Sequence, residues 1–323
     1  MTRGDVVHER SEAAPGVLQT SRRWVIAMAL SAVVLAATYL LAVWTERGQA
    51  IENAALRGAD QVRADELAQA SETLAQITIW SLGIAVVLVA VVALLRRRLD
   101  LAVAAVGIIV LGQVITQSLK RFVLPRPQLV EVVGEYTQNS FPSGHTTIAM
   151  TVLFAALIVV PYRWRGVTLF VVMTWAIGIG AYTVTAKWHR FSDTLGADAV
   201  ALTCGCLAAW WLTRRGAIIR YAGRPLRGRV VLAILVGILT AFTLVCGALL
   251  WGIPMARGVD ASVPDLIQDY NAYLGSHALA SGTSGLAALL FWRLWHRLEV
   301  AGRGDASSLR DDTDLRKLGT PSA

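Results

Sequence analysis

The sequence predicts an all-α protein, a polytopic bundle of transmembrane helices. Of its 323 residues, 55% are hydrophobic and only 16% are charged, and the mean hydropathy is +0.54. Apolar runs of about 20 residues, the length that crosses a bilayer core of about 30 Å, recur along the chain. Arginines fall between these runs and form no basic patch with interleaved aromatic residues. The net charge of +8 therefore favours membrane orientation over a nucleic-acid partner.

We expect about eight spans, six of which form a core region that extends to residue 212. The expected spans lie at about residues 24–44, 73–95, 101–119, 145–160, 167–186, 194–212 and 230–253, with an eighth that ends near residue 295. The eighth is rich in Ala, Gly and Ser, which suits close helix packing. Between the first two spans, residues 45–72 are polar and alanine-rich, and their apolar spacing predicts amphipathic helical turns on a membrane surface.

The chain divides into five regions by composition. These are a flexible cytoplasmic leader (1–22), a membrane core of six spans (23–212), a basic connector with six arginines and no acid (213–229), two additional spans (230–295) and a charged tail (296–323). The composition of the tail is typical of disorder. The three cysteines, Cys204, Cys206 and Cys246, lie in apolar runs, where they act as small hydrophobic residues and give no disulfide framework.

The arginines predict the orientation of the spans. Those at residues 22–23, 96–98, 163–165, 213–229 and 293–297 all fall on one side of an eight-span arrangement, which the positive-inside rule makes cytoplasmic, together with both termini. Two of the three lysines, Lys120 and Lys187, fall on the opposite face. Because the positive-inside rule disfavours cations on that face, these two lysines favour a functional explanation.

Three pieces of sequence meet at the outer face in this arrangement. The first holds Lys120 and Arg126, a point charge and a planar fork of donors that suit a phosphate group. The second is the run Pro142-Ser143-Gly144-His145, where Ser143 and Gly144 precede a helix whose first N–H groups are an anion site. These two pieces predict a phosphate pocket.

The third piece holds His189 and Asp193. Because they are four residues apart, on a helical turn the carboxylate can hold one ring nitrogen and leave the other free to attack phosphorus. His145 remains to protonate the leaving oxygen. No second carboxylate or Cys/His cluster with metal spacing accompanies these histidines, so we expect neither a metal nor another cofactor.

Together these pieces resemble the three-part signature of the type 2 phosphatidic acid phosphatase family, whose fold is shared with vanadium-dependent haloperoxidases. The signature is a lysine followed by Arg-Pro, then Pro-Ser-Gly-His, then an arginine followed by His and Asp. The resemblance covers roughly residues 101–212. It implies the following roles: Lys120 and Arg126 bind phosphate, Ser143 and Gly144 contact the oxyanion, His145 is the general acid, His189 the nucleophile and Asp193 its orienting partner.

The sequence departs from the family pattern at two points. Five residues separate Lys120 from Arg126 where the pattern has six, a difference that a loop or a frayed helix end can absorb. The arginine expected six residues before His189 is Thr183. Lys187 or Arg190 is a candidate for the missing charge, and we include Arg190 among the expected phosphate ligands.

The resemblance implies a membrane phosphatase that acts on a lipid phosphomonoester or diphosphate through a phosphohistidine. Phosphatidic acid, phosphatidylglycerol phosphate and polyprenyl diphosphate all fit as substrates, and the sequence predicts no oligomeric state. The main alternative is a non-catalytic lipid-phosphate binder or transporter with the same anion pocket. Haloperoxidase chemistry, which needs bound vanadate, is disfavoured by a site embedded among lipids.

Overall fold

The computed structural model describes residues 21–131, 138–221, 223, 227–259 and 264–301. Ten α-helices and two short strands make up this part of the chain. The helices are α1 (Arg22–Thr38), α2 (Glu46–Gly58), α3 (Ala64–Ala75), α4 (Ile79–Leu95), α5 (Leu99–Ser118), α6 (Gly144–Val159), α7 (Arg165–Thr185), α8 (Phe191–Arg214), α9 (Arg227–Arg257) and α10 (Leu266–Leu294). The strands are β1 (Ile218–Arg220) and β2 (Leu298–Val300). The leader to residue 20 and the tail from residue 302 lie outside the described residues.

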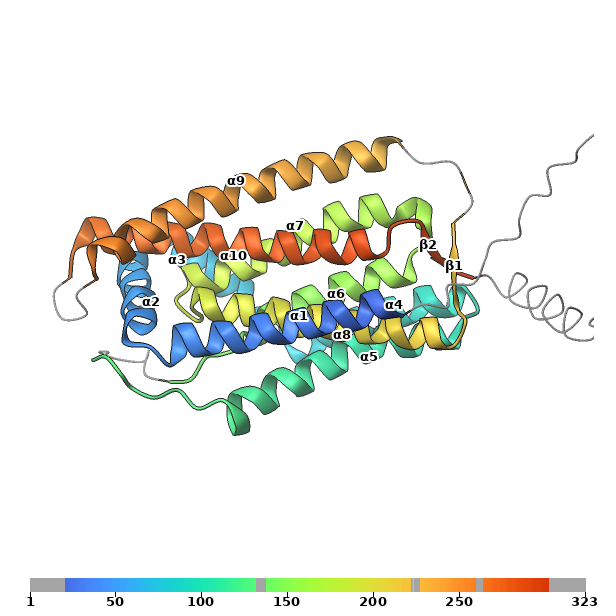
Figure 1. Ribbon diagram of the computed structural model, residues 1–323, viewed down its shortest axis with the longest axis horizontal. Coiled ribbons are helices and arrows are strands. Elements are labelled where there is room, and N and C mark those ends of the chain that lie inside the picture. The colour runs from blue at the N-terminus through green and yellow to red at the C-terminus, as the bar shows by residue number, and fades with distance from the viewer. Residues whose placement is uncertain (1–20, 132–137, 222, 224–226, 260–263, 302–323) are drawn as a thin grey trace, which may run out of the picture.

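Most of the helices run side by side along the long axis of the molecule, whereas α2 lies across one end of the bundle (Figure 1). We call this end the α2 end, and the opposite end, where β1 and β2 pair, the sheet end. Helix α8 lies at the centre, packed against α1, α5, α6 and α10. Its buried residues are mostly small, which lets these neighbours approach closely. The all-α prediction is confirmed.

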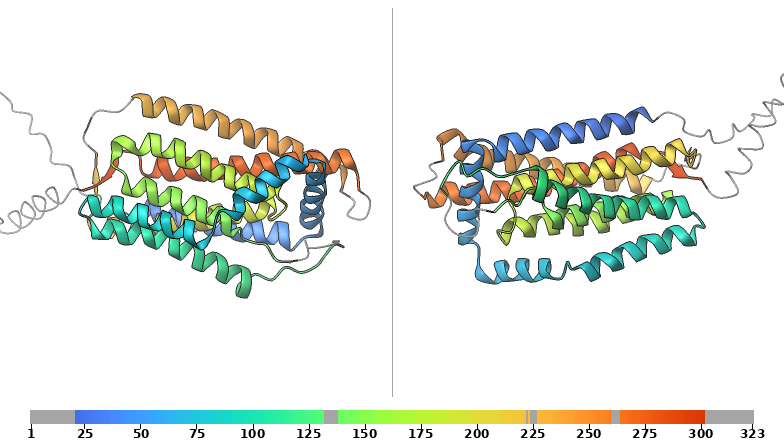
Figure 2. Two further views of the ribbon diagram at one scale, coloured as in Figure 1. Left: turned by 180° about the vertical axis from the view of Figure 1, so that it is seen from behind. Right: turned by 90° about the horizontal axis from the view of Figure 1, so that it is seen from below.

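The expectation of eight spans is wrong. Among the described residues, five helical segments are long and apolar enough to cross a membrane, and a sixth is counted if α3 and α4, bent by 60° at their junction, form one span (Figure 2). Helix α6 is too short at 16 residues. Helix α10 is long, but Asn, Gln, Ser and Thr side chains interrupt its apolar character, and other helices cover much of it. Multiple apolar helices still indicate a multi-pass membrane protein.

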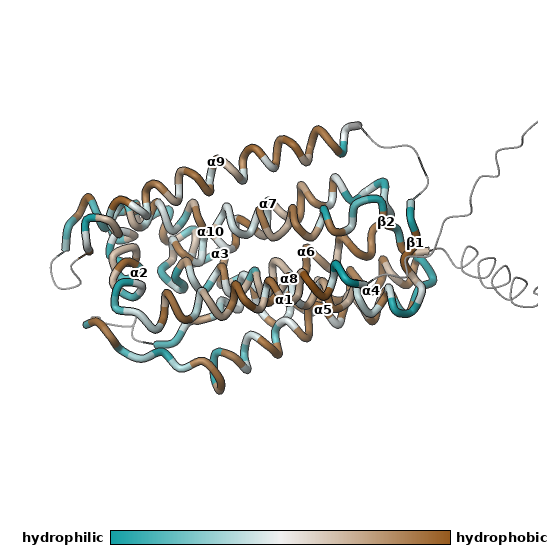
Figure 3. Tube along the Cα trace, in the orientation of Figure 1, coloured by the Kyte–Doolittle hydropathy of each residue, from teal (hydrophilic) through white to brown (hydrophobic). Residues whose placement is uncertain are grey.

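The basic segments gather at the sheet end. Arg96 donates hydrogen bonds to the carbonyl of Val159 at 3.0 Å and to the Glu299 carboxylate at 3.1 Å. The guanidinium of Arg229 lies 3.9 Å from the ring centroid of Tyr162. Figure 3 shows polar residues at both ends of the bundle and apolar residues between them. Arginines predicted to share one side of the membrane, such as Arg96 and Arg229, thus lie at one end of the fold.

An antiparallel pair of strands joins the connector to the beginning of the tail. Ile218, Ile219 and Arg220 of β1 pair with Val300, Glu299 and Leu298 of β2. The prediction of disorder from residue 296 is therefore wrong for residues 298–300, because this pairing, with buried apolar side chains on both strands, orders them. The sheet connects segments about 80 residues apart, and no local pattern marks them as partners.

The prediction that residues 45–72 lie on a membrane surface is wrong for α2. Ten of its 13 residues are buried. Arg57 makes a bidentate ion pair with Asp269 of α10, with both N···O distances at 2.8 Å. A Cβ atom at Gly58 would lie 2.0 Å from the backbone oxygen of Asp269, so only glycine permits this approach. Helix α2 is therefore part of the protein interior, packed over the end of the bundle.

Candidate active site

His189 and Asp193 meet where α8 begins. His189 lies in the short connection after α7, and Asp193 lies in the first turn of α8. Asp193 Oδ2 lies 3.2 Å from His189 Nδ1 and accepts the backbone N–H of Arg190 at 2.8 Å. Both side chains are buried. The i,i+4 spacing at a helix start therefore produces an oriented imidazole, because the carboxylate that caps the helix also holds the ring.

The run Phe141–His145 opens α6 beside this pair. Ser143 caps α6, since its Oγ accepts the N–H of Thr146 at 3.3 Å, and its own N–H donates to the backbone carbonyl of Asp193 at 2.9 Å. This bond ties the start of α6 to the start of α8. His145, in the first turn of α6, is partly exposed, and its ring centroid lies 6.3 Å from that of His189. A histidine of α6 and a histidine of the connection before α8 thus face one site.

Three cations surround the histidines. Lys120 lies in a π-helical turn, Leu119–Val123, that ends α5, and Asn139 donates hydrogen bonds to the carbonyls of Lys120 and Leu124. The Arg190 guanidinium donates to Ser140 Oγ at 3.1 Å. Arg126 is almost fully buried, with Nη2 3.7 Å from the Glu52 carboxylate. The interval between Lys120 and Arg126, one residue shorter than the family pattern, contains the π-helical turn.

Thr183 occupies a structural position behind the site. It is fully buried near the end of α7, and its hydroxyl donates to the carbonyl of Gly180 at 2.7 Å. Its own carbonyl accepts the N–H groups of Trp188 at 3.1 Å and His189 at 3.0 Å. Thr183 therefore shapes the turn that presents His189, and its side chain offers no charge to a phosphate.

Two cavities meet at Lys120 and His189, which line both. One, of about 290 Å³, has polar walls that include Arg190, Asn139 and Ser140. The other, of about 350 Å³, lies between the start of α4, α5 and α6 and is lined by His145, Gly144, Gln113 and Gln117 together with four apolar side chains. These four are Ile77, Ile79, Leu82 and Ile148. At this junction an anionic group can contact Lys120 and the polar side chains, and an apolar chain attached to it can contact the four apolar side chains.

A family model that describes the PAP2 superfamily matches residues 101–217. The chain contains a PAP2 superfamily domain. The match runs from α5 through α8 and includes all three pieces of the signature, so the family prediction is confirmed. Comparison of the chain with curated proteins and with solved structures found no match. A domain of this superfamily implies a phosphatase-type activity for this multi-pass membrane protein.

The PAP2 domain brings most of the expected site residues together. Lys120, Gly144, His145, His189 and Arg190 line the two cavities. Asp193, Ser143 and Arg126 do not line the cavities: Asp193 and Ser143 are buried and hydrogen bonded, and the Arg126 guanidinium lies 3.7 Å from the Glu52 carboxylate. Lys187, the other candidate for the missing charge, also lines the cavity of about 290 Å³ and is paired with Asp60 beyond the end of α2.

Burial affects the protonation of two groups in the connection before α8. It lowers the pKa of His189, an effect opposed by the hydrogen bond and charge of Asp193. The imidazole of His189 is therefore neutral near pH 7, the form that carries a lone pair for attack. Burial also lowers the pKa of Arg190, and the nearby charge of Arg126 adds to this shift. The two guanidiniums are thus close enough to repel each other.

Sequence reasoning missed several residues at the site, among them Glu52, Asn53 and Ser140. Glu52 Oε1 accepts the N–H of Ser192 at 3.1 Å, and Asn53 Oδ1 accepts from Arg190 at 3.4 Å. Glu52 and Asn53 come from α2, outside the PAP2 match. One feature of the sequence could have indicated Glu52: it is an acid among the apolar positions of an amphipathic segment. This feature does not indicate which residue is its partner.

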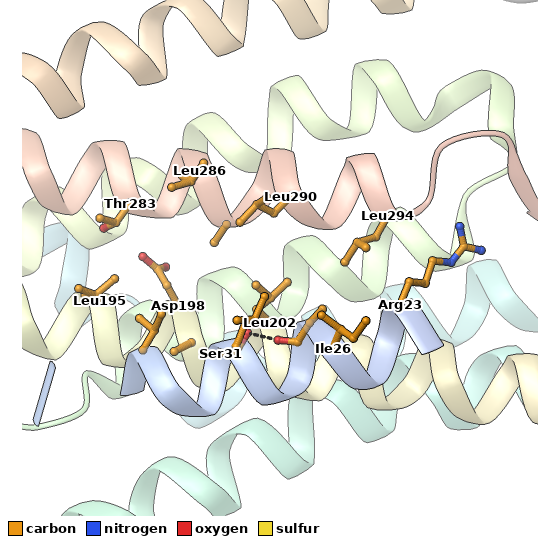
Figure 4. A pocket seen from close by; sticks show the side chains of 15 residues that line it. Arg23, Ile26, Ser31, Leu195, Asp198, Leu202, Thr283, Leu286, Leu290 and Leu294 are labelled. Atoms are coloured by element: carbon orange, nitrogen blue, oxygen red, sulfur yellow. Dashed lines mark hydrogen bonds between the residues drawn. The ribbon is translucent and has the colours of Figure 1, made fainter. Parts of the chain in front are cut away.

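A larger cavity lies away from the PAP2 signature, among α1, α8 and α10. Its volume is about 400 Å³ and its walls are mostly apolar. Figure 4 shows Leu286, Leu290 and Leu294 of α10 along it, with Asp198 facing α10 and Arg23 at the far end. Asp198 accepts hydrogen bonds from Ser284 at 2.9 and 3.0 Å. None of the expected site residues lines this cavity.

Within the described residues, no group of three His, Cys, Asp or Glu side chains is arranged to hold a metal ion. The arrangement at the PAP2 site is instead one of cations, helix-end N–H groups and two imidazoles. Such a set can bind a phosphate group, attack its phosphorus atom and protonate a leaving oxygen.

Proposed function

We propose that the protein is an integral membrane lipid phosphatase that hydrolyses a phosphomonoester or diphosphate of a lipid. The observation that carries this proposal is the pairing of an Asp193-oriented His189 with His145, at a ring-centroid distance of 6.3 Å, beside the Lys120 ammonium. This is a nucleophile, a proton donor and a phosphate ligand around one space. Each has a distinct role in phosphoryl transfer.

In the first step, the lone pair of His189 Nε2 attacks phosphorus and forms a P–N bond. The bond from phosphorus to the lipid oxygen breaks, and His145 gives its proton to that oxygen. Burial lowers the pKa of His145 to about 4 in the free site, and the bound phosphate anion favours its protonated form. Asp193 stabilises the positive charge that develops on the His189 ring. The products of this step are the dephosphorylated lipid and a phosphohistidine.

In the second step, neutral His145 accepts a proton from water as the water oxygen attacks phosphorus. The P–N bond breaks, inorganic phosphate forms, and both histidines return to their starting states. Lys120, Arg126, Arg190 and the N–H groups at the start of α6 stabilise the negative charge on the transferred oxygens. No further reactant is required.

A lipid substrate is supported by the composition of the cavity between α4, α5 and α6. Its apolar side chains, Ile77, Ile79, Leu82 and Ile148, lie beside the histidines and Lys120. A phosphate can therefore contact the cations while the adjoining apolar chain stays among the helices. Phosphatidic acid, phosphatidylglycerol phosphate and polyprenyl diphosphate share this combination of groups.

We further propose that the site faces the extracytoplasmic side and that both termini are cytoplasmic. The support is the concentration of arginines at the sheet end, opposite the site. A protease site inserted after residue 301, probed in right-side-out and inverted vesicles, tests this orientation. Cleavage in inverted vesicles alone supports it, and cleavage in right-side-out vesicles alone contradicts it.

The decisive experiment measures phosphate release from the three lipid classes by purified protein in detergent. We expect release from at least one class by the wild type and its loss in the His189→Ala and His145→Ala variants. Trapping of radioactive phosphate on the acid-quenched wild type, but not on His189→Ala, would support the phosphohistidine. Full activity of His189→Ala would contradict the mechanism.

The alternative is a non-catalytic lipid-phosphate binder or transporter, and Thr183 favours it because one expected phosphate ligand is absent. The same assay separates the two functions. A binder retains lipid phosphate without releasing inorganic phosphate, whereas a phosphatase releases it.

A further inference from the structure

Helix α2 presents one of its faces to the phosphate-binding side of the site. Gln49, Glu52, Asn53 and Leu56 follow one another at helical spacing, and Leu56 lines the polar cavity. Glu52 is only 1% exposed. An acid buried at this depth, beside a site for an anion, is costly unless it has a specific electrostatic partner.

The partners of Glu52 are the cations of the site. Its Oε2 atom lies 3.7 Å from Arg126 Nη2, and its charge also acts on Arg190, whose guanidinium is hydrogen bonded to the adjacent Asn53. Burial raises the pKa of Glu52, while the charges of Arg126 and Arg190 oppose this shift. The charge of Glu52 therefore attracts two guanidiniums that repel each other.

The contact with Arg126 leaves donors available. Within the described part of the chain, neither Nη1 nor Nη2 of Arg126 has a hydrogen-bond partner, and Oε2 of Glu52 has none either. At 3.7 Å the pair attracts by charge without a hydrogen bond. The terminal nitrogens of Arg126 are therefore buried and not hydrogen bonded within the described residues, and a phosphate oxygen that reached them would accept their hydrogen bonds.

The position of α2 is fixed from both sides. Gln49 donates hydrogen bonds to the carbonyls of Val43 and Pro127, both at 2.7 Å, and accepts the N–H of Leu129 at 3.2 Å. Pro127 directly follows Arg126. The helix that carries Glu52 therefore also holds the backbone of the segment that carries Arg126, while the Arg57–Asp269 pair holds α2 on α10.

We infer that Glu52 is a positioning residue, whose carboxylate holds Arg126 and Arg190 together as a two-guanidinium clamp for the substrate phosphate. This inference rests on the proposed function. The clamp supplies planar, bidentate donors that compensate for the arginine expected at position 183, where this chain has Thr183. It also gives α2, which lies outside the PAP2 match, a role in the reaction.

The test compares Glu52→Gln with Glu46→Gln, a matched control that removes an exposed acid from the same helix. We expect Glu52→Gln to raise KM by about ten- to hundredfold and to change kcat less than about threefold. The reason is that Arg126 and Arg190 lose the buried carboxylate that holds them in position to bind phosphate. Glu46→Gln should match the wild type. Glu52→Asp, which keeps the charge, should fall between the two.

A second measurement, calorimetric titration with inorganic phosphate, does not depend on turnover. Glu52→Gln should weaken phosphate binding by a similar factor, and this effect should shrink to less than about threefold in an Arg126→Gln background. Tighter phosphate binding by Glu52→Gln would show that the acid merely repels the ligand, which overturns the inference. So would unchanged binding, or equal effects in the two backgrounds.

These results are separable from a failure of the proposed function. If the wild type releases no phosphate from any lipid, the phosphatase proposal fails, and the titration still decides the role of Glu52. If the Glu52→Gln protein does not fold, Glu52→Asp carries the test. Its KM should then be higher than that of Glu46→Gln, and its affinity for phosphate should be weaker. Equal values for the two variants would overturn the inference.

Discussion

The Oδ2 atom of Asp193 lies 3.2 Å from the Nδ1 atom of His189. The same oxygen accepts the N–H of Arg190, so the carboxylate orients the imidazole and closes the first turn of α8 at once. Orientation of a nucleophilic imidazole by an acid depends on this charge and not on the shape of the side chain.

Replacement of Asp193 by Asn is therefore expected to reduce kcat for phosphate release by about 10²- to 10⁴-fold, while the fold is retained. The amide keeps the size of the side chain but cannot stabilise the charge on His189. Steady-state rates and circular dichroism together check this. Asp65→Asn, an exposed acid on α3, is the control and should have wild-type rates. Equal rates for the two variants would contradict the role of Asp193.

The pH dependence of kcat/KM should reflect the buried state of His189. Burial lowers its pKa below 6.5, and the attacking imidazole must be neutral. Activity controlled by this group should persist as the pH falls through 6.5 and decline only below that value. Rates measured from pH 4 to 8, with recovery checked after return to pH 7, test this. If kcat/KM falls at acidic pH with a midpoint above 6.5, the prediction is wrong.

The sequence predicted the helical class and the residues at the start of α6 and α8, because these depend on local patterns. An i,i+4 pair at a helix start and a Ser cap specify their own geometry. Packing across the chain was not predictable. The Arg57–Asp269 pair joins residues 212 positions apart, and it is this kind of contact that buries α2. The local amphipathic pattern of α2 fits a membrane surface equally well.

The span count failed for a related reason. Windows of apolar residues describe contact with lipid, whereas α10 packs against other helices and has Ser and Asp side chains at buried positions. Its Asp269, for example, is satisfied by Arg57. The role of Glu52 escaped prediction because neither Arg126 nor Arg190 is near it in sequence. Only the fold brings these charges together.

Restoring the family residue at position 183 should not improve the enzyme. Thr183 is fully buried and hydrogen bonded within α7, so an arginine there would place a large, unpaired charge in packed surroundings. We expect Thr183→Arg to destabilise the protein by about 2–4 kcal/mol and to reduce phosphate release. Thr183→Ser, which keeps the hydroxyl, should be near neutral. Thermal unfolding and activity of both variants check this, and a more active Thr183→Arg enzyme would contradict it.

The approach of Phe141 to Gly196 provides a test of how α8 positions the Pro142–His145 segment. A Cβ atom at Gly196 would lie 2.6 Å from two ring atoms of Phe141 and 3.3 Å from Pro142. Phe141 is fully buried, so we expect a shift of its ring to move the segment that leads into α6 and His145. We expect Gly196→Ala to cost about 1–3 kcal/mol of stability and to lower kcat more than KM, because His145 shifts relative to His189.

Gly107 supplies the matched control for this prediction. It is exposed in α5, and a Cβ atom added there would meet no atom within 4 Å. Alanine at position 107 should stabilise the helix by about 0.5–1 kcal/mol and leave the rate unchanged, because it only reduces backbone freedom. Melting temperatures and kcat of the two variants are compared in the same detergent. If Gly196→Ala behaves like Gly107→Ala, the loop before α6 is not held in place by its contact with α8.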